Sequence, residues 1–258
     1  MRAAVLHEFG KPPTVETLTD PVPGPGEVVV DVAAAAILPY ANEVFDGTRR
    51  YLLDLPVVPG PGAIGRVRAT GPDIGGLAPG DWVTCDPTLR SRDGAPTPEI
   101  MLQGWSARAQ GGLRLQRRFG NGSYAEQMLT PAENVFPIGA IDPAEAARWC
   151  ALLPPAAGPA PARAAALTVR EFGRVVLMGG IRDDLALPYM WLMRNSVTVR
   201  GQWMYPPAAN IELIKLVRSG LLDLGIFEVT EFGLADVQAA VDHAASHPRS
   251  FQLTALRL

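Results

Sequence analysis

The stretch VVPGPGAIGRVRATG, residues 57–71, decides how the first half of this chain is interpreted. Gly60, Gly62 and Gly65 give it the spacing G-x-G-x-x-G, which is typical of loops that bind the pyrophosphate of a dinucleotide. Such a loop follows a strand and opens a helix, because the N–H groups at the helix start bind the phosphates. After Gly65, however, the segment RVRATG has the alternation of a strand. We therefore interpret these glycines as a structural turn.

Short strands and tight turns are predicted on both sides of this stretch. The chain contains 25 Pro and 26 Gly, and apolar runs recur between them. Strands are predicted at 27–37, 63–71 and 80–87, a spacing typical of a barrel or sandwich. Residues 88–120 show little periodicity and predict an irregular lobe, whose basic run at 113–120 is interpreted as a solvated loop.

The second half of the chain has a different pattern. A Pro/Ala-rich stretch at 153–162 is typical of a linker. It is followed by a predicted helix at 161–173, by buried strands at 174–180 and 196–203, and by an amphipathic helix at 207–222. This order of elements is part of an α/β layer.

Composition excludes several classes of protein. The formal charge is −3 and the pI about 5.7, which argues against a nucleic-acid or anionic membrane surface. The two cysteines, Cys85 and Cys150, cannot build a disulfide framework and fit a reducing compartment. The start of the chain lacks the apolar region of a signal peptide, and no apolar run is long enough to span a membrane. We expect a cytoplasmic protein without nucleic-acid or membrane partners.

Several segments, in this order, resemble the medium-chain dehydrogenase/reductase superfamily, which contains zinc alcohol dehydrogenases and zinc-free quinone reductases. The segments are MRAAVLHEFGKP, PVPGPGEVVVDV, LPVVPGPGAIGRVRATGPDIGGLAPGDWV, GSYAEQMLTPAENVFPI, FGRVVLMGG, VTVRGQW, RSGLLDL and FGLADVQAAVDH. The resemblance implies a mixed α/β fold with a GroES-like β-barrel catalytic domain built from both chain ends, residues 1–152 and 223–258. Residues 153–222 would then be a truncated Rossmann-like remnant of about two parallel strands with flanking helices.

The first departure from the superfamily concerns the cofactor domain. There the helix holding RWCAL leads into a strand, a glycine-rich turn and several βα units, whereas here it leads directly into LPPAAGPAPARAAAL. A βαβ unit needs about 30 residues, so several units are missing. The segment LMGGIRDD, 177–184, cannot hold a dinucleotide alone. We expect no nicotinamide cofactor.

Since superfamily members often pair through the strand that matches VTVRGQW, we expect a homodimer through residues 196–203.

The second departure concerns zinc. A catalytic zinc needs three ligands of His, Cys or carboxylate type. By the resemblance, the ligand positions fall on Leu38, Pro61, Gly62 and Cys150, of which Cys150 alone is a ligand type. The lobe at 88–120 also lacks the cysteines of a structural zinc site. We expect no metal.

Candidate site residues follow from the same resemblance. Tyr40, Asn42 and Glu43 fall where the superfamily lines its substrate cleft. Tyr40 could donate a proton, with Asn42 orienting the ligand, and Glu43 could act as a base if burial raised its pKa. Alternatively, Tyr40 has only a packing role, and Glu43 is a solvated surface residue. For Glu43 the solvated alternative is favoured. Cys150 would lie near the cleft floor, although a lone thiol is more often a small buried hydrophobe.

Three functions remain open at this point. The favoured hypothesis is a protein that binds or transforms a small, largely apolar molecule in its cleft without nicotinamide. The second is a zinc-independent, NADPH-dependent quinone or enone reductase whose cofactor site is rebuilt across a dimer or supplied by a partner. The third is a non-catalytic module or a shortened form of such a reductase.

Overall fold

Strand β3 (Glu27–Ile37) lies at the centre of the largest sheet. Its sequence EVVVDVAAAAI is rich in β-branched and small apolar residues, and nearly every position is buried, as expected for a strand covered on both faces. It pairs antiparallel with β4 (Ala63–Thr70), β9 (Gln127–Pro131) and β14 (Gln252–Arg257). The pairing continues outward through β5 (Trp82–Cys85) to β10 (Val135–Pro137), and through β14 to β13 (Glu228–Gly233). Among the described strands this path is open and does not close on itself.

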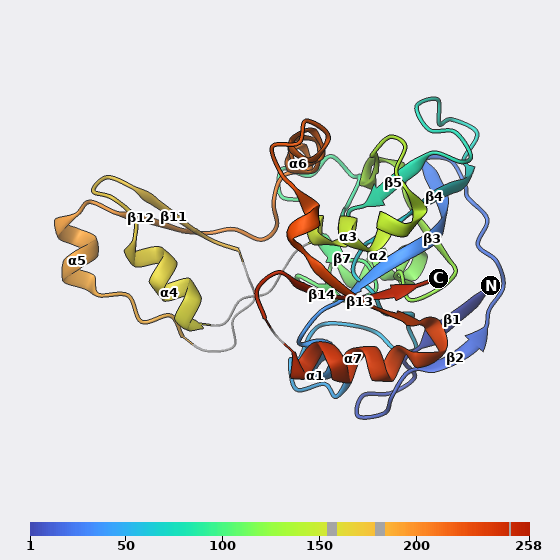
Figure 1. Cartoon of the computed structure of the whole chain (residues 1–258), viewed down its shortest axis with the longest axis horizontal. Coiled ribbons are helices and arrows are strands. Elements are labelled where there is room, and N and C mark those ends of the chain that lie inside the picture. Colours follow the sequence, from blue (N-terminus) through green and yellow to red (C-terminus); the bar gives the residue numbers. More distant parts are fainter. Residues whose placement is uncertain (154–158, 179–183, 248) are drawn as a thin grey trace. The chain divides into compact units, whose positions relative to one another are not determined.

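The computed structural model describes residues 1–153, 159–178, 184–247 and 249–258 (Figure 1). Contacts divide the chain into two units. The first unit is Met1–Leu153 with Asn210–Leu258, and the second is Pro154–Ala209. No helix in the described ranges is both long and apolar enough to cross a bilayer.

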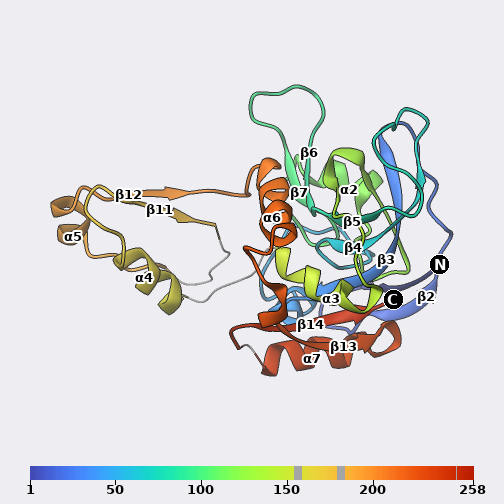
Figure 2. The same ribbon diagram turned by 45° about the horizontal axis from the view of Figure 1, so that its top comes forward.

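Both ends of the chain contribute to the first unit. Strand β1 (Arg2–Val5) pairs antiparallel with β2 (Thr14–Thr17), while β14, close to the C-terminus, pairs with β3. Figure 2 shows helix α7 (Val237–Ser246) alongside β13 and β14, and it also contacts the short helix α1 (Ala41–Phe45). Strands β1 and β2 form a two-stranded sheet of their own, whereas β14 belongs to the large sheet, so the two ends contribute to the first unit through different sheets.

Residues of β3 pack into two hydrophobic cores. Val28, Val30 and Val32 belong to a core that also contains Trp105 and Tyr124. Ala34 and Ala36 belong to a second core that includes Ile64, Trp149, Cys150 and Ile214. Helix α3 (Ala146–Trp149) supplies part of this second core. Strand β3 thus joins both cores through a single run of residues.

The prediction of an irregular lobe at 88–120 is wrong. This segment forms a three-stranded sheet from β6 (Thr88–Arg90), β7 (Ile100–Leu102) and β8 (Ser106–Ala107). The basic run predicted as a solvated loop is helix α2 (Leu113–Phe119). Apolar residues of α2 explain the difference, because they pack on a small core of their own: Leu113, Leu115 and Phe119 against Leu89 and Met101.

The second unit contains the two parallel strands that were predicted, with helices beside them. Strands β11 (Arg174–Leu177) and β12 (Thr198–Gly201) pair in parallel, and helices α4 (Pro159–Leu167) and α5 (Tyr189–Arg194) flank them. The expectation that both strands are buried is wrong. Within the described strands, Val175 is buried, whereas all of β12 is exposed.

Helix α6 (Ala208–Arg218) lies mainly in the first unit, although residues up to 222 were expected in the remnant. Asn210 Nδ2 donates to Asp86 Oδ2 at 3.0 Å, and Ile214 is buried in the second core. Of the predicted apolar side, Ile211 and Leu216 are exposed. The packing of α6 therefore depends on a buried polar contact that helical periodicity does not reveal.

Candidate functional site

Tyr40, Asn42 and Glu43 lie on one turn of the chain. Strand β3 ends at Ile37, and Tyr40 occupies the N-cap position of α1. Asn42 is exposed, and its Oδ1 accepts a hydrogen bond from the Glu43 N–H at 2.9 Å. The turn therefore places all three predicted side chains at the start of one short helix.

Arg49 joins this turn to the loop that follows it, and the sequence interpretation missed it. Its guanidinium carbon lies 3.8 Å from the centre of the Tyr40 ring, a cation–π contact. Its Nε is 3.1 Å from Glu43 Oε2, and its Nη1 donates to the Tyr51 hydroxyl at 3.2 Å. The Arg49 side chain is only 10% exposed. Because Glu43 pairs with this buried cation, the arrangement does not support Glu43 as a general base.

The Tyr40 hydroxyl is held in its neutral form. Burial raises the pKa of Tyr40 far above its ordinary value, and the nearby Tyr51 adds to this, while Trp105 and Arg49 act in the opposite direction. The rings of Tyr40 and Trp105 meet edge to face at 6.0 Å. Trp105 is fully buried, and its side chain faces the Tyr40 hydroxyl as a hydrogen-bond donor that lowers the pKa of Tyr40. A phenol in this setting is a hydrogen-bond donor at neutral pH.

Cys150 lies in the short 3-10 turn Cys150–Leu152, which follows α3. Burial raises the pKa of its thiol to about 12, with a smaller contribution from Glu231. Tyr124, whose hydroxyl donates to the Ala36 carbonyl at 3.0 Å, has a pKa raised by burial and further by Tyr40 and Cys150. Tyr40 and Cys150 therefore both lie near Tyr124. A buried neutral thiol gives no support for a nucleophilic role.

The glycine-rich stretch forms a turn and then a strand, as predicted. Gly60 and Gly62 have positive φ angles of 113° and 84°. Gly65 lies in β4, where a Cβ atom would be 2.2 Å from the Asp31 carbonyl oxygen of β3. These glycines are required by backbone conformation and by close approach of neighbouring strands.

The positions that the resemblance matched to zinc ligands are buried and apolar. Leu38, Pro61 and Gly62 carry no donor atom in a side chain, and a Cβ at Gly62 would lie 2.7 Å from Leu153 Cδ2. In the described part of the chain, no three His, Cys, Asp or Glu side chains are grouped to hold a metal. The segment 177–184 lies mostly outside the described residues, since 179–183 are not among them.

Comparison with known proteins adds a second line of evidence. Residues 24–140 match the alcohol dehydrogenase GroES-like domain. An alcohol dehydrogenase from Moraxella sp. (strain TAE123) is 33% identical over 138 residues, which are 52% of this chain and 39% of that protein. The matched domain and this relative both point to the alcohol dehydrogenase-like medium-chain dehydrogenase/reductase superfamily. An alcohol dehydrogenase from Rhizobium meliloti (strain 1021) is 34% identical over 98 residues, 38% of this chain and 28% of its own length. The matches thus span well under half of either relative.

Solved structures of this superfamily share the fold. The alcohol dehydrogenase of Aeropyrum pernix aligns over 100% of both chains with a TM-score of 0.75 and 15% identity. A cobalt- and zinc-bound alcohol dehydrogenase from Pyrobaculum aerophilum aligns over 100% of this chain and 99% of its own, with a TM-score of 0.70 and 19% identity. The matched GroES-like domain contains the whole Tyr40–Arg49 cluster, whereas Cys150 lies beyond its end.

Proposed function

We propose that this protein binds a small, largely apolar carbonyl compound beside Tyr40, and that it acts without nicotinamide. The single observation that carries the proposal is the environment of Tyr40. Its hydroxyl is kept protonated by burial, and its ring is fixed between the Arg49 guanidinium and the buried Trp105 indole. A neutral donor next to a cation suits a ligand oxygen that gains negative charge.

In this proposal each group near Tyr40 has one role. The Tyr40 O–H donates a hydrogen bond to the ligand oxygen and polarises the carbonyl group. The Arg49 charge strengthens this donor, because it offsets part of the effect of burial on the pKa of Tyr40. Asn42 can orient the ligand through Nδ2, since its Oδ1 accepts from the Glu43 N–H. Glu43 fixes Arg49 through their ion pair.

The donor chemistry of the described residues supports a site without zinc. The matched positions Leu38, Pro61 and Gly62 offer no ligand atoms, and a larger residue at Gly62 would collide with Leu153. They do not fit a catalytic zinc ion, so no step is assigned to one. The only G-x-G-x-x-G spacing in the sequence runs into strand β4, which does not fit a dinucleotide loop.

Titration separates this proposal from an oxidoreductase function. Isothermal calorimetry with a cyclic enone, such as cyclohexenone, is expected to give saturable binding that Tyr40→Phe weakens. The same experiment with NAD(H) and NADP(H) is expected to give none. Micromolar binding of NADH or NADPH, or hydride transfer from them to the enone by the purified chain, would support the reductase alternative instead. Failure of every ligand to bind would support a non-catalytic module.

We also propose that the protein pairs with a second copy through β12. All four residues of this strand are exposed, and within the described strands β12 pairs with β11 alone. Apolar residues are exposed on the same unit, including Phe172, Val176 and Tyr189. An exposed strand edge favours pairing with another strand.

A further inference from the structure

A pocket of about 380 Å³ lies in the first unit where five chain segments meet. These are the chain start at Met1, the chain between β2 and β3, the loop before β4, the end of α2 with the residues after it, and strand β9. Within the described residues, none of Tyr40, Asn42 and Arg49 is part of its lining. The pocket is therefore separate from the site proposed above.

Amide side chains hold the pocket walls in place. Gln116 of α2 donates to the Asp54 carbonyl at 2.5 Å and accepts from the Asp54 N–H at 3.0 Å. Asn121 Oδ1 accepts from the Val58 N–H at 3.1 Å. The buried Gln103 donates to the carbonyls of Asn121 and Leu129, at 2.8 and 2.6 Å. Because these bonds connect different segments, the pocket is formed before any ligand enters.

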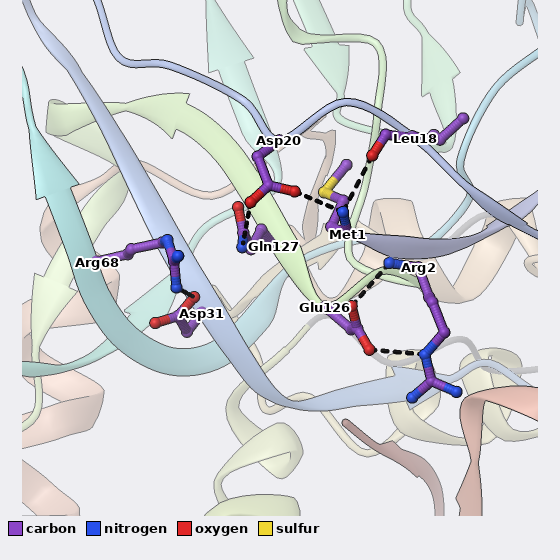
Figure 3. A network of polar contacts seen from close by, with 8 residues as sticks. All are labelled: Met1, Arg2, Leu18, Asp20, Asp31, Arg68, Glu126 and Gln127. Carbon is purple, nitrogen blue, oxygen red and sulfur yellow. Dashed lines mark hydrogen bonds and ion pairs between the residues drawn. The ribbon is translucent and has the colours of Figure 1, made fainter.

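One wall contains a glutamine side chain, Gln127, whose hydrogen bonding is incomplete. Figure 3 shows Asp20 between the Met1 amine and Gln127, whose Nε2 donates to Asp20 at 3.4 Å. Gln127 is only 7% exposed, and its Oε1 has no hydrogen-bond partner among the described residues. Because Oε1 is buried, Gln127 closes this wall and offers no accessible acceptor to a ligand.

The charge of the pocket is positive. Arg118 pairs with the buried Glu27 and is neutralised by it. Its neighbour Arg117 is exposed and makes no hydrogen bond or ion pair with the residues that the structure describes. No Asp or Glu is among the described lining residues. Leu18, Val22 and Phe119 supply apolar surface beside this cation.

We propose that this pocket binds a small organic carboxylate that has an apolar body. Arg117 pairs with the carboxylate, since a guanidinium matches its two oxygens. The apolar body lies against the residues around Leu18 and Phe119. The apolar walls favour an organic anion over inorganic phosphate, which has no surface to bury.

The test is calorimetric titration of the full chain with 4-hydroxybenzoate. Saturable binding is expected, with Arg117→Gln weakening it about fivefold to tenfold. Arg114→Gln is the matched control, because Arg114 lies on the same helix and is exposed but does not line the pocket. A second variant, Val22→Asp, places a carboxylate at the exposed rim and is expected to weaken binding similarly.

Neutral and inorganic probes complete the experiment. The neutral 4-hydroxybenzamide and inorganic phosphate are each expected to bind at least about tenfold more weakly. Amide chemical shifts should change at Val57, Asn121 and Gln127 when 4-hydroxybenzoate is added. Equal binding of the benzamide, an equal effect of the two arginine variants, or shifts confined to the Tyr40 turn would overturn the proposal. Variants are compared only where their circular dichroism matches that of the original chain.

Discussion

Arg49 determines what Tyr40 and Glu43 can do. It contacts the Tyr40 ring at 3.8 Å, pairs with Glu43 at 3.1 Å and is almost completely buried. Tyr40 is thereby a fixed neutral donor, while Glu43 serves as the partner of a cation. The chemistry of the turn depends on a residue that the predicted site did not contain.

Replacing Arg49 should therefore weaken ligand binding through Tyr40. We expect Arg49→Gln to reduce affinity for cyclohexenone about fivefold, because the ring loses its cation–π partner. Arg50→Gln is the control, since Arg50 is the exposed neighbour in the same loop. Calorimetry measures both. Equal affinities for the two variants would mean that Arg49 does not position Tyr40.

Gly65 is expected to be intolerant of a side chain. In Gly65→Ala the new Cβ would lie 2.2 Å from the Asp31 carbonyl oxygen, and backbone of β3 cannot move away cheaply. The free energy of unfolding should fall by about 3 kcal/mol in urea titrations. Gly75→Ala is the matched control, because its Cβ meets no described atom within 4 Å. A similar loss in both variants would contradict this account.

Because of Cys150, the stability of the folded protein should decrease in the alkaline pH range. The pKa of its thiol is raised to about 12 in the folded protein, from a reference value of 9.0. The unfolded chain therefore releases this proton first, and stability falls as pH rises from about 9 towards 12. The melting temperature of Cys150→Ala should decline less steeply over that interval. An identical slope in both proteins would show that the thiol does not contribute.

The resemblance predicted that Tyr40, Asn42 and Glu43 line a substrate cleft, whereas their position on one turn and their individual contacts come from the structure. Their place in the chain follows from β3 and the resemblance, and the structure keeps them together. Arg49 was missed because a loop residue has no periodicity that shows where its side chain packs. The glycine turn was predicted correctly, since the strand pattern after Gly65 is local.

Helix α2 is attached to β3 by an ion pair of which only the carboxylate is buried. Arg118 contacts Glu27 through Nε at 2.8 Å, and Glu27 also accepts from the Gly24 N–H at 2.7 Å. The Arg118 side chain is 54% exposed, whereas that of Glu27 is 10% exposed. The hydrogen bond from Arg118, followed by that from Gly24, holds the pKa of Glu27 below its ordinary value, against the opposing effect of burial.

The two partners of this pair should differ in their effect on stability. Arg118→Ala leaves a largely buried carboxylate without its cation, although water can enter where the exposed arginine lay, and should cost about 2 kcal/mol. Glu27→Gln leaves an arginine that water can solvate and should cost about 1 kcal/mol. In the original chain this contribution is present above the unfolded pKa and is lost as pH falls through the lower folded pKa. Urea titration at neutral and at acid pH measures the free energy of unfolding of each variant. Arg117→Ala is the control for the effect of alanine on the helix propensity of α2.

Elements with strong local patterns were predicted better than those stabilised by distant contacts. Strands β3 and β4 follow directly from runs of β-branched residues between turns. Helix α2 was missed because its basic residues suggested a solvated loop, while Leu113 and Phe119 pack on residues far away in sequence. Helix α6 was predicted, but its unit was not, since Asn210 bonds to Asp86 across 124 residues.

Across the whole chain, the resemblance predicted that both ends build one unit; in the structure β14, near the C-terminus, pairs with β3. The boundary at the end of the second unit differs from the one predicted at residue 222, because α6 packs with the first unit from Asn210 onward. Such a boundary depends on tertiary contacts, which the linker-like composition near residue 153 does not specify.

The proposed dimer can be tested at one backbone N–H group of β12. The N–H groups of Thr198 and Gln202 donate to Gly173 and Leu177 beside β11. Strand alternation therefore directs the Val199 N–H to the open edge. A second copy that pairs here would give a continuous four-stranded sheet. Val199→Pro removes this donor and leaves the bonds to β11, so we expect a monomer.

Val199→Ala is the matched variant, since it shortens the side chain but keeps the N–H. Light scattering with size exclusion should give a dimer for the original chain and for Val199→Ala, and a monomer for Val199→Pro. A dimer in all three would place the interface elsewhere. A monomer for the original chain at every concentration would remove the proposal, and the exposed apolar residues Phe172 and Tyr189 would then need another partner.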